Sequence, residues 1–182
     1  MLLQRLAVRA ALACHGAFMS RLAYYADFVS MPALALALIL FGGATLPGIA
    51  LGLVAWTLAE YVIHRVLFHR LPLFKAGHDE HHAKPSGRTG VTSWHSLLVF
   101  GVLFLALPAG VLAGLALGYL AYIAAHHAVH HWRIAPGHVL YGLKIRHAMH
   151  HRGDEVNFGV VTTAWDRVFG TYRPIRSKPG QV

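Results

Sequence analysis

The chain has 182 residues, of which 56% are hydrophobic and only 13% charged, a composition that favours one membrane domain over an ordinary soluble protein. Its formal charge is +9, but no recognition motif accompanies that charge, so we expect no nucleic-acid partner. The single cysteine, Cys14, excludes an intrachain disulfide and a cysteine-based zinc site.

The first segment, residues 1–21, is interpreted as an amphipathic helix that lies in the membrane interface. Its start is positively charged, and Arg9 interrupts its apolar stretch, which argues against a cleaved signal peptide. The remaining residues, 22–182, are expected to form one membrane domain.

Two long stretches of that domain contain no Asp, Glu, Lys or Arg. The first covers 32 residues from Phe28 to Ala59, and the second covers 44 residues from Thr89 to Trp132. A helix needs about 20 apolar residues to cross the hydrocarbon core, so each stretch accommodates two spans. The sequence therefore predicts an all-α membrane protein with four transmembrane helices in two hairpins. The expected spans are residues 22–41, 46–66, 93–107 and 111–131.

The positive charges predict how these spans are oriented. All 16 Lys and Arg lie before Phe28, between His64 and Thr89, or after Trp132. With four spans, these three blocks share one side of the membrane, and the positive-inside rule makes that side cytosolic. We therefore expect both termini, the loop 67–92 and a histidine-rich helical cap at 132–182 to be cytosolic.

Fourteen of the 15 histidines lie at or beyond position 64, and twelve of these form four groups at the predicted membrane boundaries. The groups are His64 and His69; His78, His81 and His82; His126, His127, His130 and His131; and His147, His150 and His151. Many neutral imidazoles at an apolar boundary need partners, and this recurring pattern is typical of metal coordination. The isolated His15, His95 and His138 are interpreted as ordinary polar residues.

The spacing within each group indicates which imidazoles share a face. Positions i, i+3 and i+4 lie on one side of a helix, so the second and fourth groups each present three imidazoles together. His64 and His69 would point about 140° apart on a straight helix, so binding one metal requires a helix end or a distortion.

The third group offers two alternative pairs with i, i+4 spacing. His126 and His130 continue a face with Gly118 and Tyr122, which suits packing between helices. His127 and His131 follow Leu120 and Ile123, which suits contact with lipid. The facing argument favours the first pair as ligands and leaves the second as bystanders or supporting residues.

The number of candidate ligands indicates two metal ions. Ten histidines exceed the roughly six positions around one first-row ion, and neutral imidazole suits iron, zinc or copper. Glu60, one turn before His64, either orients that histidine or is an acid at the membrane edge. The other acids near the histidines are expected to be solvated: Asp79, Glu80, Asp154 and Glu155.

The ordered boxes H-x4-H, H-x2-HH, H-x3-H and H-x2-HH, between paired spans, resemble the fatty acid hydroxylase and sterol desaturase superfamily. Its members are integral membrane, non-haem di-metal oxygenases. The closing "NFGVVTTAWDRVFGTY", residues 157–172, is similar to their C-terminal segment, and "EYVIHRVLFH" is most similar to the fatty acid 2-hydroxylase branch. The resemblance covers roughly residues 55 to 175.

The resemblance implies a division of the ligands between two ions. One ion would take His64, His69, His78, His82 and His150. The other would take His81, His126, His130, His147 and His151. No catalytic residue is expected beyond these ligands. The working ions would be two irons with dioxygen as co-substrate, although purified protein could contain zinc, which is redox-inert.

The resemblance also implies an oxidoreductase that hydroxylates or desaturates a lipid drawn from the bilayer, with a fatty acyl chain as the first candidate. Eukaryotic 2-hydroxylases carry a fused haem electron-carrier domain, for which this chain has no room, so we expect a separate electron-transfer protein and reductase. A sterol or carotenoid ring hydroxylase or desaturase of the same superfamily is the alternative.

Two alternatives come from other functional classes. A membrane metal transporter or sensor would place polar residues along an ion path, but no acid or histidine lies in the middle of any expected span. A metal-dependent membrane hydrolase would be expected to show an H-E-x-x-H motif, which the sequence lacks.

Overall fold

Helices form all the regular secondary structure in the residues that the computed structural model describes, which are 20–87, 93–153 and 155–175. This confirms the all-α fold class. The helix expected within residues 1–21 lies outside the described residues except for its last two positions. The elements are α2 (Arg21–Tyr25), α3 (Asp27–Leu40), α4 (Leu46–Val62), the π-helix η1 (Ile63–Phe68), α5 (Pro72–Ala83), α6 (Ser93–Phe104), α7 (Ala109–His131), α8 (Tyr141–His150) and α9 (Ala164–Val168).

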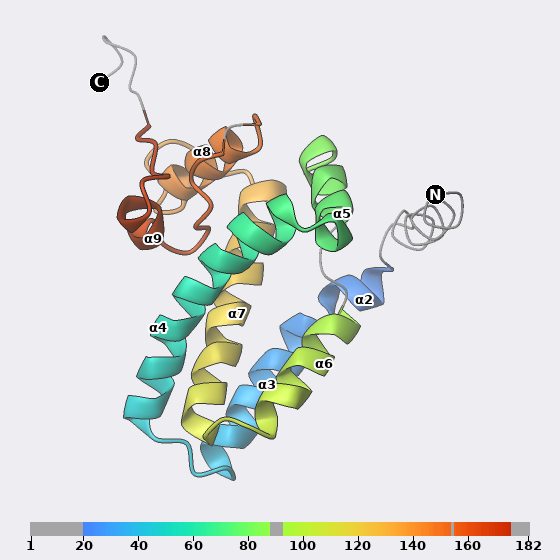
Figure 1. The fold of residues 1–182 in the computed structure, drawn as a ribbon, viewed down its shortest axis with the longest axis vertical. Helices are drawn as coiled ribbons and strands as arrows, with labels where there is room; N and C mark the ends of the chain where they lie inside the picture. Colours follow the sequence, from blue (N-terminus) through green and yellow to red (C-terminus); the bar gives the residue numbers. More distant parts are fainter. Residues whose placement is uncertain (1–19, 88–92, 154, 176–182) are drawn as a thin grey trace.

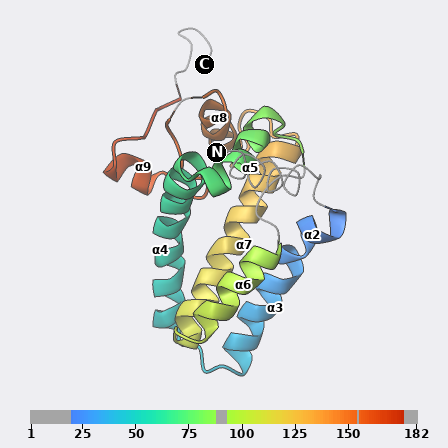
Figure 2. The same cartoon turned by 45° about the vertical axis from the view of Figure 1, so that its right-hand side comes forward.

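The apolar helices α3, α4, α6 and α7 run side by side, and α5, α8 and α9 gather at one end of them (Figures 1 and 2). Helix α7 is the central element, because it packs on both α3 and α4 and also contacts α6. The buried core lies between α3, α6 and α7, with Met31, Leu112 and Phe100 among its members. The bundle thus carries the α5, α8 and α9 cap on the end where α7 finishes.

Helices α4 and α7 approach each other at glycines. A Cβ atom on Gly52 would collide with the carbonyl oxygen of Val111, and one on Gly114 would collide with the carbonyl oxygen of Ile49. Small residues at such positions let two membrane helices pack backbone against backbone. This close packing fixes the end of α4 beside the end of α7, where the histidines begin.

Three helical segments within the described residues are long and apolar enough to cross a membrane: 21–40, 46–68 and 109–131. They agree with three of the four expected spans to within a few residues. The span expected at 93–107 is instead the 12-residue helix α6, which ends at Phe104. A proline at position 108 disfavours helical backbone at the residue before it, which accounts for the early end. The four-span topology is therefore not confirmed.

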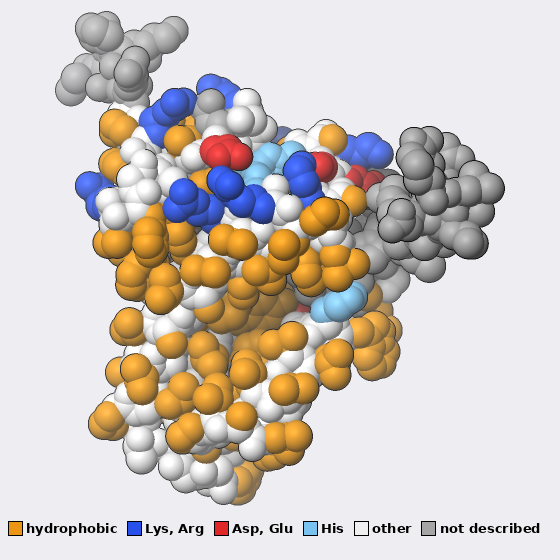
Figure 3. Space-filling view, viewed as in Figure 1, with side chains coloured by type: hydrophobic (Ala, Val, Ile, Leu, Met, Phe, Trp, Pro, Cys, Tyr) orange, Lys and Arg blue, Asp and Glu red, His pale blue; other side chains and the backbone are white. Residues whose placement is uncertain are grey.

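On the face that Figure 3 shows, the surface of the bundle is apolar, whereas basic side chains gather around the cap. Large side chains such as Leu36, Val54 and Leu105 are more than half exposed on it. A continuous apolar surface of this extent supports a bilayer as the environment of the bundle.

Helix α6 is joined to its neighbours by a buried acid for which the sequence pattern predicted no role. Asp27 at the start of α3 accepts hydrogen bonds from Ser96 of α6 at 2.6 Å and from Tyr119 of α7 at 2.7 Å. Ser93 also donates to the carbonyl oxygen of Ala23 at 2.6 Å. Because these donors satisfy the carboxylate, an acid is tolerated inside the bundle.

Candidate metal centre

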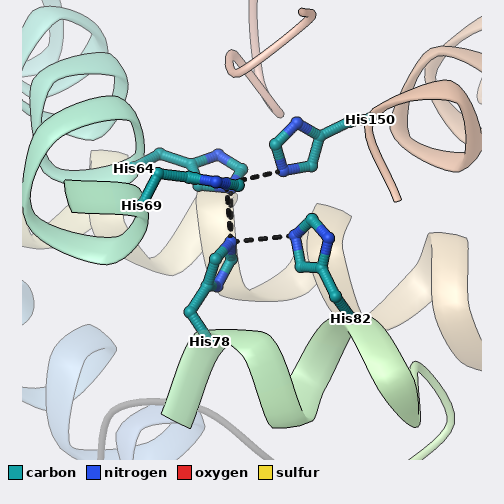
Figure 4. A group of neighbouring side chains, drawn as sticks. All are labelled: His64, His69, His78, His82 and His150. Carbon is teal, nitrogen blue, oxygen red and sulfur yellow. Dashed lines mark hydrogen bonds between the residues drawn. The ribbon is translucent and has the colours of Figure 1, made fainter. Parts of the chain in front are cut away.

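Five imidazoles from three parts of the chain converge at the membrane end of the cap (Figure 4). His64 and His69 come from η1 and its end, His78 and His82 from α5, and His150 from α8. One ring nitrogen of each lies within 4.8 Å of the others. The shortest separations between their Nε2 atoms are 3.0 to 3.2 Å. We refer to these five residues as the first histidine group.

The π-helix explains how His64 and His69 reach the same point. Residues 63–68 have π-helical rather than α-helical hydrogen bonding, and His69 caps the segment. Because a π-turn bonds residue i to i+5, it widens the helix and brings positions five apart to the same side. The two ring centres lie 5.3 Å apart. The distortion that the H-x4-H spacing requires is therefore this π-turn.

A second histidine group forms beside the first one. Its members are His81, His126, His130, His147 and His151, again with one nitrogen from each within 4.8 Å of the others. The shortest separations between their Nε2 atoms are 2.8 to 3.2 Å. Helix α7 therefore contributes two members to this group and none to the first.

The structure brings together all ten histidines singled out in the sequence, and it divides them as the family resemblance implies. In α5, His78 and His82 face the first group, whereas His81 faces the second. In the α8 region, His147 and His151 face the second group and His150 faces the first. Residues i and i+4 share a face more closely than i and i+3, so each HxxHH box serves both groups.

Two backbone carbonyl groups determine where the imidazole protons lie. Nδ1 of His64 donates to the carbonyl oxygen of Phe158 at 2.5 Å, and Nδ1 of His150 donates to that of Val156 at 3.0 Å. A carbonyl oxygen only accepts, so in each neutral ring the proton is on Nδ1 and Nε2 presents a lone pair. These lone pairs point toward other Nε2 atoms, an arrangement that a cation would stabilise.

The environment keeps the imidazoles uncharged at neutral pH. Burial, followed by the neighbouring imidazoles, lowers the pKa of His81 to about 2 and that of His151 to about 3. Burial and His82 lower the pKa of His69 to about 4. Burial likewise places the pKa of His147 well below its usual value. Neutral imidazole is the form that binds metals, so both groups are ready to do so without losing protons.

Glu60 is neither a direct partner of His64 nor a solvated acid. Its side chain is buried, and Oε1 accepts hydrogen bonds from the backbone N–H groups of Val160 at 2.5 Å and Val161 at 3.0 Å. It thereby anchors the loop whose Phe158 carbonyl accepts the proton of His64. Glu60 therefore orients His64 through the backbone of this loop.

Asp166 is a second loop anchor, and the sequence reasoning missed it. The carboxylate is fully buried and accepts from the backbone N–H groups of Phe158 and Gly159, both at 2.8 Å. The hydroxyl of Thr171 donates to it at 2.7 Å. Asp166 lies within the quoted C-terminal segment, but no spacing rule links it to backbone groups seven and eight residues earlier.

Of the acids expected to be solvated, Asp79 and Glu155 are exposed and lie outside both histidine groups, whereas Glu80 is half-buried. Asp79 pairs with Lys75 at 2.6 Å, and Glu155 pairs with Arg70 at 3.2 Å. Asp154 lies outside the described residues. Such exposed pairs contribute little to stability.

The other histidines belong to neither group. His127 and His131 were expected to face lipid, but His127 packs against α2, where its Nδ1 lies 2.9 Å from the hydroxyl of Tyr24. The ring of His131 stacks on His127 with centres 4.5 Å apart. The expectation of a lipid-facing His127 is therefore wrong, because α2 folds against this side of α7. His95 and His138 are exposed, and His15 lies outside the described residues.

Comparison with known proteins places this architecture in context. A family model described as "Fatty acid hydroxylase" matches residues 49–171. The fatty acid 2-hydroxylase of Homo sapiens is 35% identical over 149 residues, which cover 70% of this chain and 40% of that protein. The ceramide very long chain fatty acid hydroxylase scs7 of Schizosaccharomyces pombe is 35% identical over 153 residues, or 72% of this chain and 44% of that protein.

A solved structure shares the fold. It is described as "Full length scs7p (only hydroxylase domain visible)" and superimposes with a TM-score of 0.66 at 26% identity. The match covers 85% of this chain and 70% of the solved one. The chain spans less than half the length of the human and fission yeast relatives.

Proposed function

The chain belongs to the fatty acid hydroxylase family, and from this premise we propose that it is a membrane oxidoreductase that hydroxylates the acyl chain of a lipid. The observation that carries the proposal is the convergence of ten neutral imidazoles into two groups of five. From the family resemblance we further propose iron as the metal in both groups and dioxygen as the oxidant.

The residues fit two metal ions of the kind that nitrogen ligands prefer. The first ion would be held by the first histidine group, and the second ion by the second histidine group. The carbonyl groups of Phe158 and Val156 hold the Nδ1 protons of His64 and His150, so the Nε2 lone pairs of these rings point inward. These lone pairs repel one another, and a bound cation would be coordinated by them. When bound, a redox-active pair of iron ions would supply dioxygen activation for attack on a C–H bond.

The chain itself contributes positioning, neutrality and exclusion of water. Burial of His64, His81, His147 and His150 shields the centre of both groups from solvent. The loop anchored by Glu60 and Asp166 covers the first group through the ring of Phe158, which contacts His64, His69 and His150. An enclosed apolar site favours reaction with a bound acyl chain over side reactions with water.

The location of the groups suits a lipid substrate. They lie where the apolar bundle meets the charged cap, so an acyl chain could reach them from the bilayer while its head group stays at the interface. We propose that this end is cytosolic, in keeping with its basic residues. We also propose that a separate electron-transfer protein and its reductase supply electrons at the cap.

The proposal is tested with iron-loaded protein in lipid bilayers, a reductant chain and ¹⁸O-labelled dioxygen. We expect acyl products that carry one labelled oxygen, measured by mass spectrometry in parallel reactions with ceramide, free fatty acid, sterol and carotenoid substrates. Labelled sterol or carotenoid without labelled acyl product would replace the substrate assignment. No labelled product from any substrate, despite two bound irons per chain, would overturn the proposed activity.

A further inference from the structure

An open groove lies on the outer side of η1, apart from both histidine groups. Its volume is about 340 Å³, and its lining consists of Tyr61, Val62, Arg65, Val66, Arg70 and Phe169. Four of these side chains are apolar or aromatic and two carry guanidinium groups. The exposed lining is almost wholly apolar, so the two arginines contribute to it through their side-chain stems and carry their charges at its edge.

Arg65 supplies a charge that no acid neutralises. One of its guanidinium nitrogens donates to the hydroxyl of Tyr61 at 2.8 Å, and the group lies 5.8 Å from the ring centre of Tyr61 and 5.9 Å from that of Phe158. No carboxylate within the described residues forms an ion pair with Arg65. The aromatic rings hold the guanidinium in place but leave its charge available to an anion.

Arg70 adds a second positive charge at the rim of the groove. Its guanidinium is paired with Glu155 at 3.2 Å, but both side chains are more than half exposed. An exposed pair of this kind is weak and can exchange partners. Arg65 is therefore the main anchor for an anion, and Arg70 is an auxiliary one.

The level of the groove along the helix indicates where such an anion would come from. Val62 and Val66 are each 40% exposed on the same outer face, and Phe169 is 48% exposed beside them. Arg65 is the first cationic residue after the charge-free stretch that α4 shares, near the end of the candidate span 46–68. At this level the hydrocarbon of a bilayer gives way to its head groups.

We propose that this groove is a binding site for one anionic phospholipid. Its phosphate would lie against Arg65 and Arg70, and an acyl chain would run down α4 over Val66 and Val62. A zwitterionic or neutral lipid offers no net charge to compensate Arg65, and free phosphate would leave the apolar wall uncovered. The proposal of this lipid site does not rest on the proposed hydroxylation.

Lipid binding in this groove should affect the first histidine group. The guanidinium of Arg65 lies 5.9 Å from the ring centre of Phe158, and that centre lies 5.2 Å from the ring centre of His69 and 5.3 Å from that of His150. A lipid that fixes Arg65 would therefore restrain the loop that covers this group. The measurable consequence is a higher unfolding temperature, because a ligand of the folded state stabilises it.

The test titrates phosphatidylglycerol into the metal-loaded protein in a neutral detergent and records the unfolding midpoint. We expect a saturable rise with phosphatidylglycerol, and little rise with phosphatidylcholine or with glycerol phosphate. Arg65→Gln should weaken the apparent affinity by about fivefold, the scale of one basic residue at an anionic surface. Val66→Trp, which fills the groove without changing charge, should abolish the saturable rise.

Arg133→Gln is the matched control, since it removes one exposed positive charge from the loop after α7. It should leave the titration unchanged. Equal weakening by Arg133→Gln and Arg65→Gln, or an undiminished response in Val66→Trp, would overturn the site in favour of general attraction to anionic lipid. An equal response to glycerol phosphate would overturn the lipid as ligand. Metal content, measured in parallel, separates these outcomes from a failure of the proposed metal centre.

Discussion

At the scale of single residues, each imidazole has a specific role that its neighbours impose. The Nδ1 atoms of His64 and His150 donate to backbone carbonyls, so the Nε2 lone pairs face inward. Ten histidines can occupy so small a volume because burial keeps them uncharged. The same residue type one position along α7 has a different role, as His127 and His131 demonstrate.

The contrast between His130 and His131 gives the first prediction. Nε2 of His130 lies 2.8 Å from Nε2 of His147, whereas His131 stacks on His127 outside the group. We expect His130→Ala to lower bound metal from two ions per chain toward one, and His131→Ala to retain both. Metal analysis of the purified proteins measures this difference. Retention of both ions by His130→Ala would refute the assignment of His130 as a ligand.

Glu60 gives a second prediction, because its carboxylate acts at a distance from the metal. Glu60→Ala leaves the N–H groups of Val160 and Val161 without an acceptor, at a cost of about 1–3 kcal/mol for the buried group of Val160 and less for that of Val161, which is partly exposed. We expect a lower unfolding temperature and selective loss of the metal in the first histidine group. Glu60→Gln, which keeps an acceptor oxygen, should largely restore both.

Glu155→Ala is the control for Glu60→Ala, since it removes an exposed acid that pairs with the exposed Arg70. Its effect on stability should be under about 1 kcal/mol. If Glu60→Ala behaves like this control in both metal content and unfolding temperature, the loop does not depend on the buried carboxylate.

At the scale of helices, two local irregularities position the site. The π-turn of η1 aligns His64 with His69, and glycine contacts bring α4 against α7. A regular α-helix would point His64 and His69 apart, and a larger side chain at Gly52 would collide with α7. The site thus depends on how helices deviate and pack, in addition to which residues they carry.

The glycine contact gives a third prediction. A methyl group on Gly52 would collide with the carbonyl of Val111, so Gly52→Ala should destabilise the protein by about 1–3 kcal/mol, as overpacking does. Gly101 of α6 has open space around the same position, and Gly101→Ala should be neutral or slightly stabilising, since alanine favours helix. Unfolding in detergent compares the two variants. Equal stability of both would show that α4 and α7 can separate at no cost.

At the scale of the whole molecule, an apolar bundle supports a cap whose parts meet mainly at the two histidine groups. Helix α5 provides three of the ten histidines and packs on η1, whereas α8 packs on the end of α7. Without ions, inward lone pairs face one another across these elements. The bundle, in contrast, is held by apolar packing and by the hydrogen bonds to Asp27.

Removal of metal should therefore loosen the cap before the bundle, which is the fourth prediction. After chelation, we expect backbone amides of α5 and α8 to exchange with solvent at least about tenfold faster, while amides in the middle of α7 are unchanged. Hydrogen exchange followed by mass spectrometry measures both regions in one sample. Adding zinc should restore protection, because restoring the fold needs a cation but no redox chemistry. Unchanged exchange in α5 and α8 would mean that the cap is stable without ions.

Sequence patterns were sufficient to predict the class of the protein and the candidate ligands. Long charge-free stretches predicted apolar helices, because lipid tolerates few charges, and three of the four spans appear at the expected places. The four histidine boxes identified ten residues that the fold brings together, because i, i+4 spacing fixes which side of a helix a residue faces. Hydropathy and histidine spacing are local properties, so they can be read from short segments of sequence.

The roles of residues that contact distant segments became clear from the tertiary structure. The role of Glu60 comes from backbone groups a hundred residues away, and Asp166 gains its role because its loop folds onto the end of α4. His127 meets α2 instead of lipid, since α2 folds against α7. The hydropathy pattern also did not predict that α6 would end at Phe104. Periodicity reports which face a residue occupies, but the neighbour on that face is set by how the helices pack.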